Sequence, residues 1–203
     1  MCIWRYKTNG GVTMTVTNIL IVGVGGQGTL LTSRILAQAA INMGHDVKVS
    51  EIHGMAQRGG SVVTQVRYGD QVYAPIIQKG TADILLAFEK LEAARLLDYL
   101  RPNGQLIVND EQIDPLPVLS GKAKYPTDIL TKMNAVVKNM RVVKASKIAE
   151  DIGNRKAANV VMVGLLAKVA EFDKEVVKEA LAQLVPPKTM DINLAAFEAG
   201  YQQ

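Results

Sequence analysis

An apolar run that ends in closely spaced glycines constrains the fold of this chain more than any other feature. Residues 18–22, Asn-Ile-Leu-Ile-Val, are typical of a strand buried on both faces of a parallel sheet. The run Gly-Val-Gly-Gly-Gln-Gly follows at 23–28, and residues 29–42 then carry apolar side chains at helical spacing until Gly44 ends the helix. Residues 46–51 predict a second strand. Strand, glycine turn, helix and strand together predict a βαβ unit.

The middle of the chain predicts more strands and one further helix. The strands are expected at 61–68, 71–74, 82–87, 105–109 and 140–143. Gly69-Asp70 separates the first two of these strands, which predicts an antiparallel hairpin. The helix is expected over 89–100, ended by Pro102-Asn-Gly104. The Pro-rich section 114–126 is expected to be a loop with a short strand.

The C-terminal part is predicted to be helical over 154–171, 173–184 and 193–200. Strands that alternate with helices indicate an α/β fold, a doubly wound and mostly parallel Rossmann-like sheet with an antiparallel hairpin and C-terminal helices. We expect a single domain over 14–203. Residues 1–13 match no strand or helix pattern, and we interpret them as a leader, an upstream start or an expression remnant.

Composition limits the classes of function. The 203 residues carry a net charge of +4 with acidic and basic residues intermixed, so nothing indicates a nucleic acid or membrane partner. Cys2 is the only cysteine, so the chain cannot form an internal disulfide or supply the thiolates that an iron–sulfur cluster needs. A reducing, cytoplasmic setting fits this cysteine content.

The glycine loop is the first candidate binding site. Gly23, Gly25 and Gly28 satisfy G-x-G-x-x-G after a strand and before a helix, and Gly26 and Gln27 lie between them. Such glycines permit a tight turn, leave backbone N–H groups uncovered and place an anion at the helix N-terminus. The alternative is that they only let the helix pack closely against the strand.

A dinucleotide is one ligand that this loop could bind. Glu51 ends the second strand, near the position where dinucleotide-binding folds place the acid that binds ribose. A dehydrogenase is disfavoured, because the chain has no Tyr-x-x-x-Lys and its only histidines are His45 and His53. A stand-alone nucleotide-binding or regulatory module stays open as an alternative. We predict no catalytic residue and no metal site on this chain, since neither histidine has a second ligand at metal-binding spacing.

The loop over 50–61 is the second candidate binding site, because loops at the carboxyl ends of parallel strands hold the sites of open α/β sheets. Its candidate residues are Glu51, His53, Arg58, Gly59, Gly60 and Ser61. Arg58 before two glycines could present a guanidinium beside bare amides, an arrangement that binds anions. The alternative is that Arg58 only pairs with Glu51 and the glycines turn the chain.

Together the two loops resemble one known protein family. The runs Gly23-Val-Gly-Gly-Gln-Gly28 and Glu51-Ile-His-Gly-Met-Ala-Gln-Arg-Gly-Gly-Ser-Val62 are similar to the gamma-type domain of pyruvate and other 2-oxoacid:ferredoxin oxidoreductases. The longer His-Gly-Met-Ala-Gln-Arg-Gly-Gly form is similar to the indolepyruvate branch in particular. Residues 82–95 and 193–201 are also similar to this family, and the resemblance covers about 17–201.

This resemblance implies a non-autonomous subunit of a thiamine-dependent enzyme. A large partner subunit would carry thiamine diphosphate, Mg²⁺ and [4Fe–4S] clusters, and this chain would carry no cofactor. The holoenzyme would convert an arylpyruvate and coenzyme A into an aryl-acetyl-CoA and CO₂ while it reduces ferredoxin. Gly69-Asp70-Gln71 departs from the Gly-Asp-Gly of a thiamine diphosphate site, which agrees with this division. The two loops would then complete the active-site wall or a coenzyme A pocket.

Overall fold

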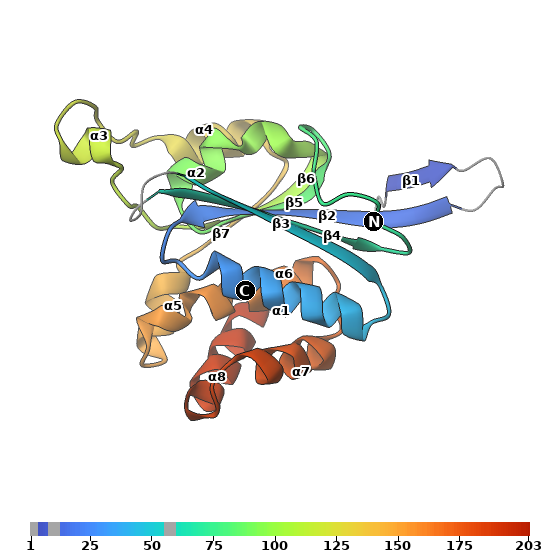
Figure 1. Ribbon diagram of the computed structural model, residues 1–203. Coiled ribbons are helices and arrows are strands. Elements are labelled where there is room, and N and C mark those ends of the chain that lie inside the picture. The colour runs from blue at the N-terminus through green and yellow to red at the C-terminus, as the bar shows by residue number, and fades with distance from the viewer. Residues whose placement is uncertain (1–3, 8–12, 55–59) are drawn as a thin grey trace.

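A computed structural model describes residues 4–7, 13–54 and 60–203 of the chain. Within these residues, seven strands form one sheet with helices on both of its faces (Figure 1). The strands are β1 (Trp4–Lys7), β2 (Thr13–Val24), β3 (Asp46–His53), β4 (Ser61–Gly69), β5 (Ala82–Ala87), β6 (Leu100–Asn109) and β7 (Asn139–Val143). They are ordered β3-β4-β2-β5-β6-β7, and β1 pairs with β2.

The α-helices cover the two faces of this sheet, except α3, which projects away from the sheet (Figure 1). They are α1 (Thr29–Asn42), α2 (Lys90–Arg95), α3 (Leu116–Leu119), α4 (Ile129–Val136), α5 (Ala145–Asp151), α6 (Ala158–Val169), α7 (Lys174–Leu184) and α8 (Met190–Tyr201). Short 3₁₀ turns lie at Leu97–Tyr99, Arg155–Ala157 and Pro187–Thr189. None of the helices in the described part of the chain is long and apolar enough to cross a bilayer.

Strand direction confirms the predicted doubly wound, mostly parallel sheet. Strands β2, β5, β6 and β7 run parallel to one another. Strand β4 is antiparallel to both β2 and β3, so β3 points the same way as β2. The predicted βαβ unit is therefore present as β2-α1-β3, but β4 lies between its two strands.

Alternate side chains of the central strands fill two apolar cores. Ile19 and Ile21 of β2 face α1 and α5–α8, whereas Leu20 and Val22 face α2 and α4 on the other side. All six residues of β5 are buried, because this strand has a strand on each side and helices on each face. The continuous apolar runs of the sequence therefore reflect burial on both faces, as expected for parallel strands.

The predicted hairpin is placed wrongly. Residues 71–74 form no strand, and β4 pairs with β2 and β3 instead. After Gly69 the chain bonds to the amino ends of two strands through side chains and not through a strand ladder: Asp70 accepts a hydrogen bond from the Thr15 N–H of β2 (3.0 Å), and the Val72 N–H donates to the Asp46 carboxylate of β3 (2.8 Å). The antiparallel pair formed by two strands consecutive in the sequence is β3–β4.

Several element boundaries also differ from the predictions. Helix α2 ends at Arg95 rather than near residue 100, and Pro102-Asn103-Gly104 lie inside β6. The section 114–126 contains the short helix α3 and no strand, and helices α4 and α5 are not predicted. Strand β1 forms within residues 1–13, where no element is predicted. The C-terminal helices lie close to their predicted ranges.

Candidate functional site

Both candidate loops lie at one edge of the sheet, which we call the carboxyl edge. It consists of the carboxyl ends of β2, β3, β5, β6 and β7 and the amino end of β4. The connection after β2 passes over one face through α1, and the connection after β5 passes over the opposite face through α2 (Figure 1). The glycine loop thus lies at the topological switch point, where open α/β sheets bind their ligands.

A backbone hydrogen bond joins the two candidate loops. Gly23 is buried at the end of β2, whereas Gly25 and Gly26 are exposed. The Gly25 N–H donates to the Gly60 carbonyl at 2.9 Å. The glycine loop and the end of the 50–61 loop are therefore parts of one surface.

Gly28 has two reasons to be glycine. It caps α1 in the left-handed conformation (φ 82°), which L residues with a side chain rarely adopt. A Cβ at this position would also lie 2.7 Å from Nδ2 of Asn159, which is buried on α6. The glycine motif predicts close approach of the helix to the strand, whereas the residue that crowds Gly28 belongs to the helix α6.

The side chain of Gln27 holds the glycine loop against the next strand. Its Oε1 accepts a hydrogen bond from the Val24 N–H at 2.7 Å, and its Nε2 donates to the Phe88 carbonyl at 3.0 Å. Phe88 directly follows β5, so this amide connects the two strands at the switch point. Gln27 therefore sets the shape of the loop, because both ends of its amide are engaged within the chain.

Asn109 of β6 likewise binds Phe88, from the other side of β5. It is not among the site residues predicted from the sequence. Its Nδ2 donates to the same Phe88 carbonyl (3.2 Å), and its Oδ1 accepts from the Ala145 N–H (2.9 Å). It is buried at the last position of β6. An asparagine that ends an apolar strand run is the sequence signal that could have identified it.

Acidic side chains complete the carboxyl edge. Glu111 accepts hydrogen bonds from Ser146 and from Arg155, the latter at 2.7 Å. Glu89 is buried, caps α2 through the Glu92 N–H (2.9 Å), and accepts from the Tyr125 hydroxyl, whose pKa is raised mainly by burial. The Glu111 bonds connect the section after β6 to α5 and to the 3₁₀ turn at Arg155–Ala157, and the Tyr125–Glu89 bond connects it to the start of α2.

Ser61, a predicted site residue, has a partner inside the chain. Its hydroxyl donates to Glu92 Oε2 at 2.5 Å, and Glu92 Oε1 pairs with Arg95 at 2.9 Å. Ser61 is the first residue of β4, so this contact ties that strand to α2. Ser61 therefore has a structural role at the rim of the candidate site.

Glu51 and His53 lie together at the end of β3. Glu51 is largely buried, and its Oε1 lies 2.6 Å from His53 Nε2, while the His53 side chain is 63% exposed. Arg58 and Gly59 lie outside the described residues, so the predicted pairing of Arg58 with Glu51 stays a prediction. Within 4–7, 13–54 and 60–203, no group of three or more His, Cys, Asp or Glu side chains is arranged to bind a metal ion.

The position of Glu51 differs from that of a ribose-binding acid. In a dinucleotide-binding sheet the strand that carries the acid lies beside the strand that precedes the glycine loop. Here β4 lies between β3 and β2, which adds one strand spacing of about 4.8 Å. The geometry at the carboxyl edge is therefore unlike a dinucleotide site.

A cavity of about 550 Å³ lies at the opposite edge of the sheet and contains none of the predicted site residues. Size alone would favour that cavity as the functional site. We place the candidate site at the carboxyl edge instead, because exposed loop backbone there lies at the switch point of an open sheet.

Comparisons with known proteins agree with the predicted family. Residues 18–203 match the family described as pyruvate ferredoxin/flavodoxin oxidoreductase. The indolepyruvate oxidoreductase subunits IorB of Archaeoglobus fulgidus and Thermococcus kodakarensis are 45% and 42% identical to this chain. These alignments cover 92% and 90% of this chain, and 94% and 93% of the relatives.

A solved structure supports the same assignment. The gamma subunit of a keto/oxoacid ferredoxin oxidoreductase from Geobacter sulfurreducens PCA superposes with a TM-score of 0.69 at 25% identity. The superposition covers 92% of this chain and 96% of that subunit. The sequence match, the sheet topology and the glycine loop agree, and the chain therefore belongs to the pyruvate ferredoxin/flavodoxin oxidoreductase family, as one of its small subunits.

Proposed function

We propose that this chain is the small subunit of an arylpyruvate:ferredoxin oxidoreductase, with indolepyruvate as the favoured substrate. In the reaction the 2-oxoacid loses CO₂, its remaining acyl group forms a thioester with coenzyme A, and two electrons pass to ferredoxin. The relatives at 42–45% identity, which align over nearly their whole length, support indolepyruvate as the substrate. We further propose that the complex is cytoplasmic.

The cofactors of this reaction would belong to a large partner subunit. A single cysteine cannot ligate a [4Fe–4S] cluster, which needs about four thiolates. The Gly69-Asp70-Gln71 run departs from the Gly-Asp-Gly of a thiamine diphosphate site, and Asp70 accepts two hydrogen bonds from Thr15 at the end of β4. When bound on the partner, these groups would supply the decarboxylation and electron-transfer chemistry.

This chain would contribute an anion-binding wall at its carboxyl edge. Gly25 and Gly26 are exposed, and α1 begins without an acidic residue in its first turn. Uncovered N–H groups and the positive end of a helix favour a phosphate or carboxylate. We propose that this surface, with Arg58, binds a phosphate of coenzyme A. The single observation that supports the proposal is the Gly25–Gly60 hydrogen bond, because it brings Gly60, two residues after Arg58 in the sequence, against the glycine loop.

The alternative of a stand-alone nucleotide-binding module has less support. It needs a ribose-binding acid beside the glycine loop, and Glu51 is separated from β2 by an additional strand. Family membership also favours a subunit over a separate module.

The test is reconstitution with the large subunit. The isolated chain should be colourless and inactive toward indolepyruvate with a viologen acceptor, and the reconstituted pair should be active. Arg58→Ala should raise the KM for coenzyme A, with a loss of about 2–5 kcal/mol in binding or transition-state stabilisation. Arg141→Ala, which removes an exposed arginine from β7, is the matched control and should behave as wild type.

The subunit assignment and the anion-binding role can be contradicted separately. Unaided turnover by the isolated chain would contradict the subunit assignment. Wild-type kinetics and assembly of Arg58→Ala would contradict the anion-binding role of the 50–61 loop but leave the subunit assignment intact.

A further inference from the structure

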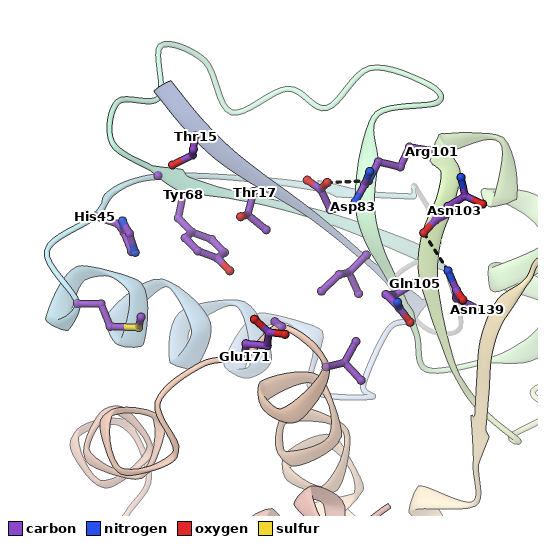
Figure 2. A pocket seen from close by; sticks show the side chains of 15 residues that line it. Thr15, Thr17, His45, Tyr68, Asp83, Arg101, Asn103, Gln105, Asn139 and Glu171 are labelled. Carbon is purple, nitrogen blue, oxygen red and sulfur yellow. Dashed lines mark hydrogen bonds and ion pairs between the residues drawn. The ribbon is translucent and has the colours of Figure 1, made fainter. Parts of the chain in front are cut away.

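The edge of the sheet opposite the candidate site contains a cavity of about 550 Å³ (Figure 2). We call it the amino-edge cavity, because the amino ends of β2, β5, β6 and β7 line it together with the carboxyl end of β4. Its size is in the range of pockets that bind small organic molecules, about 300–1,000 Å³. Polar side chains from elements far apart in the sequence point into it, among them Thr17, Tyr68, Gln105 and Glu171 (Figure 2).

The charges that line the cavity are unevenly compensated. Arg101 and Asp83 neutralise each other, since Arg101 Nε lies 2.7 Å from Asp83 Oδ1 and both side chains are largely buried. Asp83 also accepts the Asn18 N–H at 2.8 Å. Glu171 at the cavity mouth forms no ion pair with another residue in the described part of the chain. Its carboxylate is therefore the uncompensated charge of the cavity.

Two helix ends add to this negative potential. Helix α1 ends at the cavity with Met43 as its C-cap, and α6 ends there with Ala170 as its C-cap. The carbonyl end of a helix carries a partial negative charge, which favours a cation nearby. The helix ends and Glu171 thus both favour a positively charged ligand.

The backbone at the cavity is strained at two positions. Asn103 (φ 62°) and Glu171 (φ 58°) are the two residues other than glycine with positive φ in the described ranges, and both line this cavity. Glu171 directly follows the C-cap of α6, and its left-handed conformation ends that helix, with the Phe172 N–H donating to the Ala167 carbonyl at 2.9 Å. A side chain in this conformation costs about 1 kcal/mol. At Glu171 this conformation directs the carboxylate into the cavity, on the side of Tyr68 (Figure 2).

An aromatic and aliphatic wall faces these polar groups. The Tyr68 ring is buried between His45 (5.5 Å between ring centroids) and Phe172 (5.2 Å). Burial raises the pKa of the Tyr68 hydroxyl to about 12, so it stays a neutral hydrogen-bonding group at physiological pH. Met43 and Ile84 supply apolar surface beside it.

We propose that the amino-edge cavity binds a small primary amine with an aromatic or apolar body. The ammonium group pairs with Glu171 near the ends of α1 and α6, and the body lies against Tyr68. The site is distinct from the carboxyl edge, so the two can be occupied at the same time.

The probe is phenethylamine, added to the 203-residue chain at neutral pH and followed by ¹H–¹⁵N NMR. We expect saturable shifts at Thr17, Tyr68 and Gln105. The neutral analogue 2-phenylethanol should bind at least about five- to tenfold more weakly, and 3-phenylpropionate more weakly still, because each lacks the charge that pairs with Glu171. Equal or tighter binding of either analogue, shifts centred on the carboxyl edge, or no saturation below about 10 mM would overturn the proposal.

Three variants separate charge from strain. Glu171→Gln keeps a long side chain and should weaken phenethylamine binding about five- to tenfold. Glu171→Gly should weaken binding equally but raise the melting temperature, because glycine adopts a φ of 58° without strain. Glu179→Gln, the matched control, removes an exposed carboxylate from α7 away from the cavity and should leave binding within twofold of wild type. Equal losses in Glu171→Gln and Glu179→Gln would contradict a specific ion pair.

Discussion

The two edges of the sheet differ in how their polar side chains are used. At the carboxyl edge, Gln27, Asn109 and Ser61 are bonded within the chain and leave exposed glycine backbone as the available surface. At the amino edge, side chains such as Thr17 and Tyr68 surround an open cavity. One edge therefore presents fixed backbone groups, suited to an anion or a partner surface, and the other presents a polar pocket. The recognisable sequence motif lies at the carboxyl edge, whereas the cavity of about 550 Å³ lies at the amino edge.

Helix α6 connects the two edges, and breaking its packing should have the largest effect. Asn159 near its start contacts Gly28, and Val169 at its end lines the amino-edge cavity. Between them, a Cβ on Gly164 would lie 2.1 Å from the Phe197 carbonyl oxygen of α8. Gly164→Ala should therefore force the two helices apart and lower the free energy of unfolding by about 3 kcal/mol or more, measured by urea denaturation.

Gly121→Ala is the control for the Gly164 variant, because a Cβ there meets nothing within 4 Å. It should cost about 1 kcal/mol through its positive φ alone. Comparable losses in the two variants would show that α6 and α8 can separate freely.

Gly28→Ala changes a residue of the carboxyl edge and should lower the free energy of unfolding by about 2–3 kcal/mol. The variant combines strain at φ 82° with a clash against Asn159. Adding Asn159→Ala should remove the clash and regain that part of the stability, while the strain remains. Gly26→Ala shares a positive φ but has open space around it, and should cost about 1 kcal/mol. Equal stabilities of Gly28→Ala and Gly26→Ala would contradict the close contact with α6.

Tyr68→Phe probes the amino edge through pH. Because the folded-state pKa of Tyr68 is raised to about 12 from 10.0, folding favours the protonated phenol. The stability that this provides is complete below pH 10 and is lost as the pH rises toward 12, by up to about 2–3 kcal/mol. Tyr68→Phe should flatten this alkaline decline, as measured by chemical denaturation between pH 9 and 12. An unchanged decline would mean that the phenol is not buried.

Tyr73→Phe is the control for the alkaline experiment, because the Tyr73 side chain is 78% exposed. It should retain the wild-type decline. The half-buried Tyr125 also has a raised pKa, so the informative quantity is the difference between wild type and Tyr68→Phe.

Removal of residues 1–13 should have the smallest effect. Strand β1 pairs only with β2 among the described strands, at the end of the sheet, and a two-stranded extension is marginally stable in water. We propose that this segment is dispensable, with a change of no more than about 1 kcal/mol in the free energy of unfolding. A large drop in the melting temperature would show that β1 contributes to the fold.

The sequence predicts well the features that a single contiguous segment encodes. The apolar run before Gly23, the helix over 29–42 and the C-terminal helices carry their own periodicity, so the fold class and the glycine loop follow from local patterns. The pairing of β4 with β2 is not local. Residues 71–74 resemble a strand, but β4 already has β3 on one side and β2 on the other, so no neighbouring position is left for a hairpin partner.

The amino-edge cavity shows why the remainder could not be predicted. Thr17, Tyr68 and Arg101 come from three separate strands and Glu171 from the turn between α6 and α7, and none belongs to a motif. Pro102-Asn-Gly104, which line it in part, resemble a helix stop yet lie within β6. The cavity and the strand conformation of residues 102–104 both depend on contacts between distant segments, so neither can be predicted from a short stretch of sequence.

Hydrogen exchange of the chain, alone and in complex with the large subunit, tests most directly the claim that the carboxyl edge faces the catalytic partner. The account predicts that complex formation slows amide exchange at residues 23–28 and 51–61 and leaves the residues of the amino-edge cavity unchanged. Protection confined to the amino edge, with unchanged exchange in the two glycine-rich loops, would contradict it.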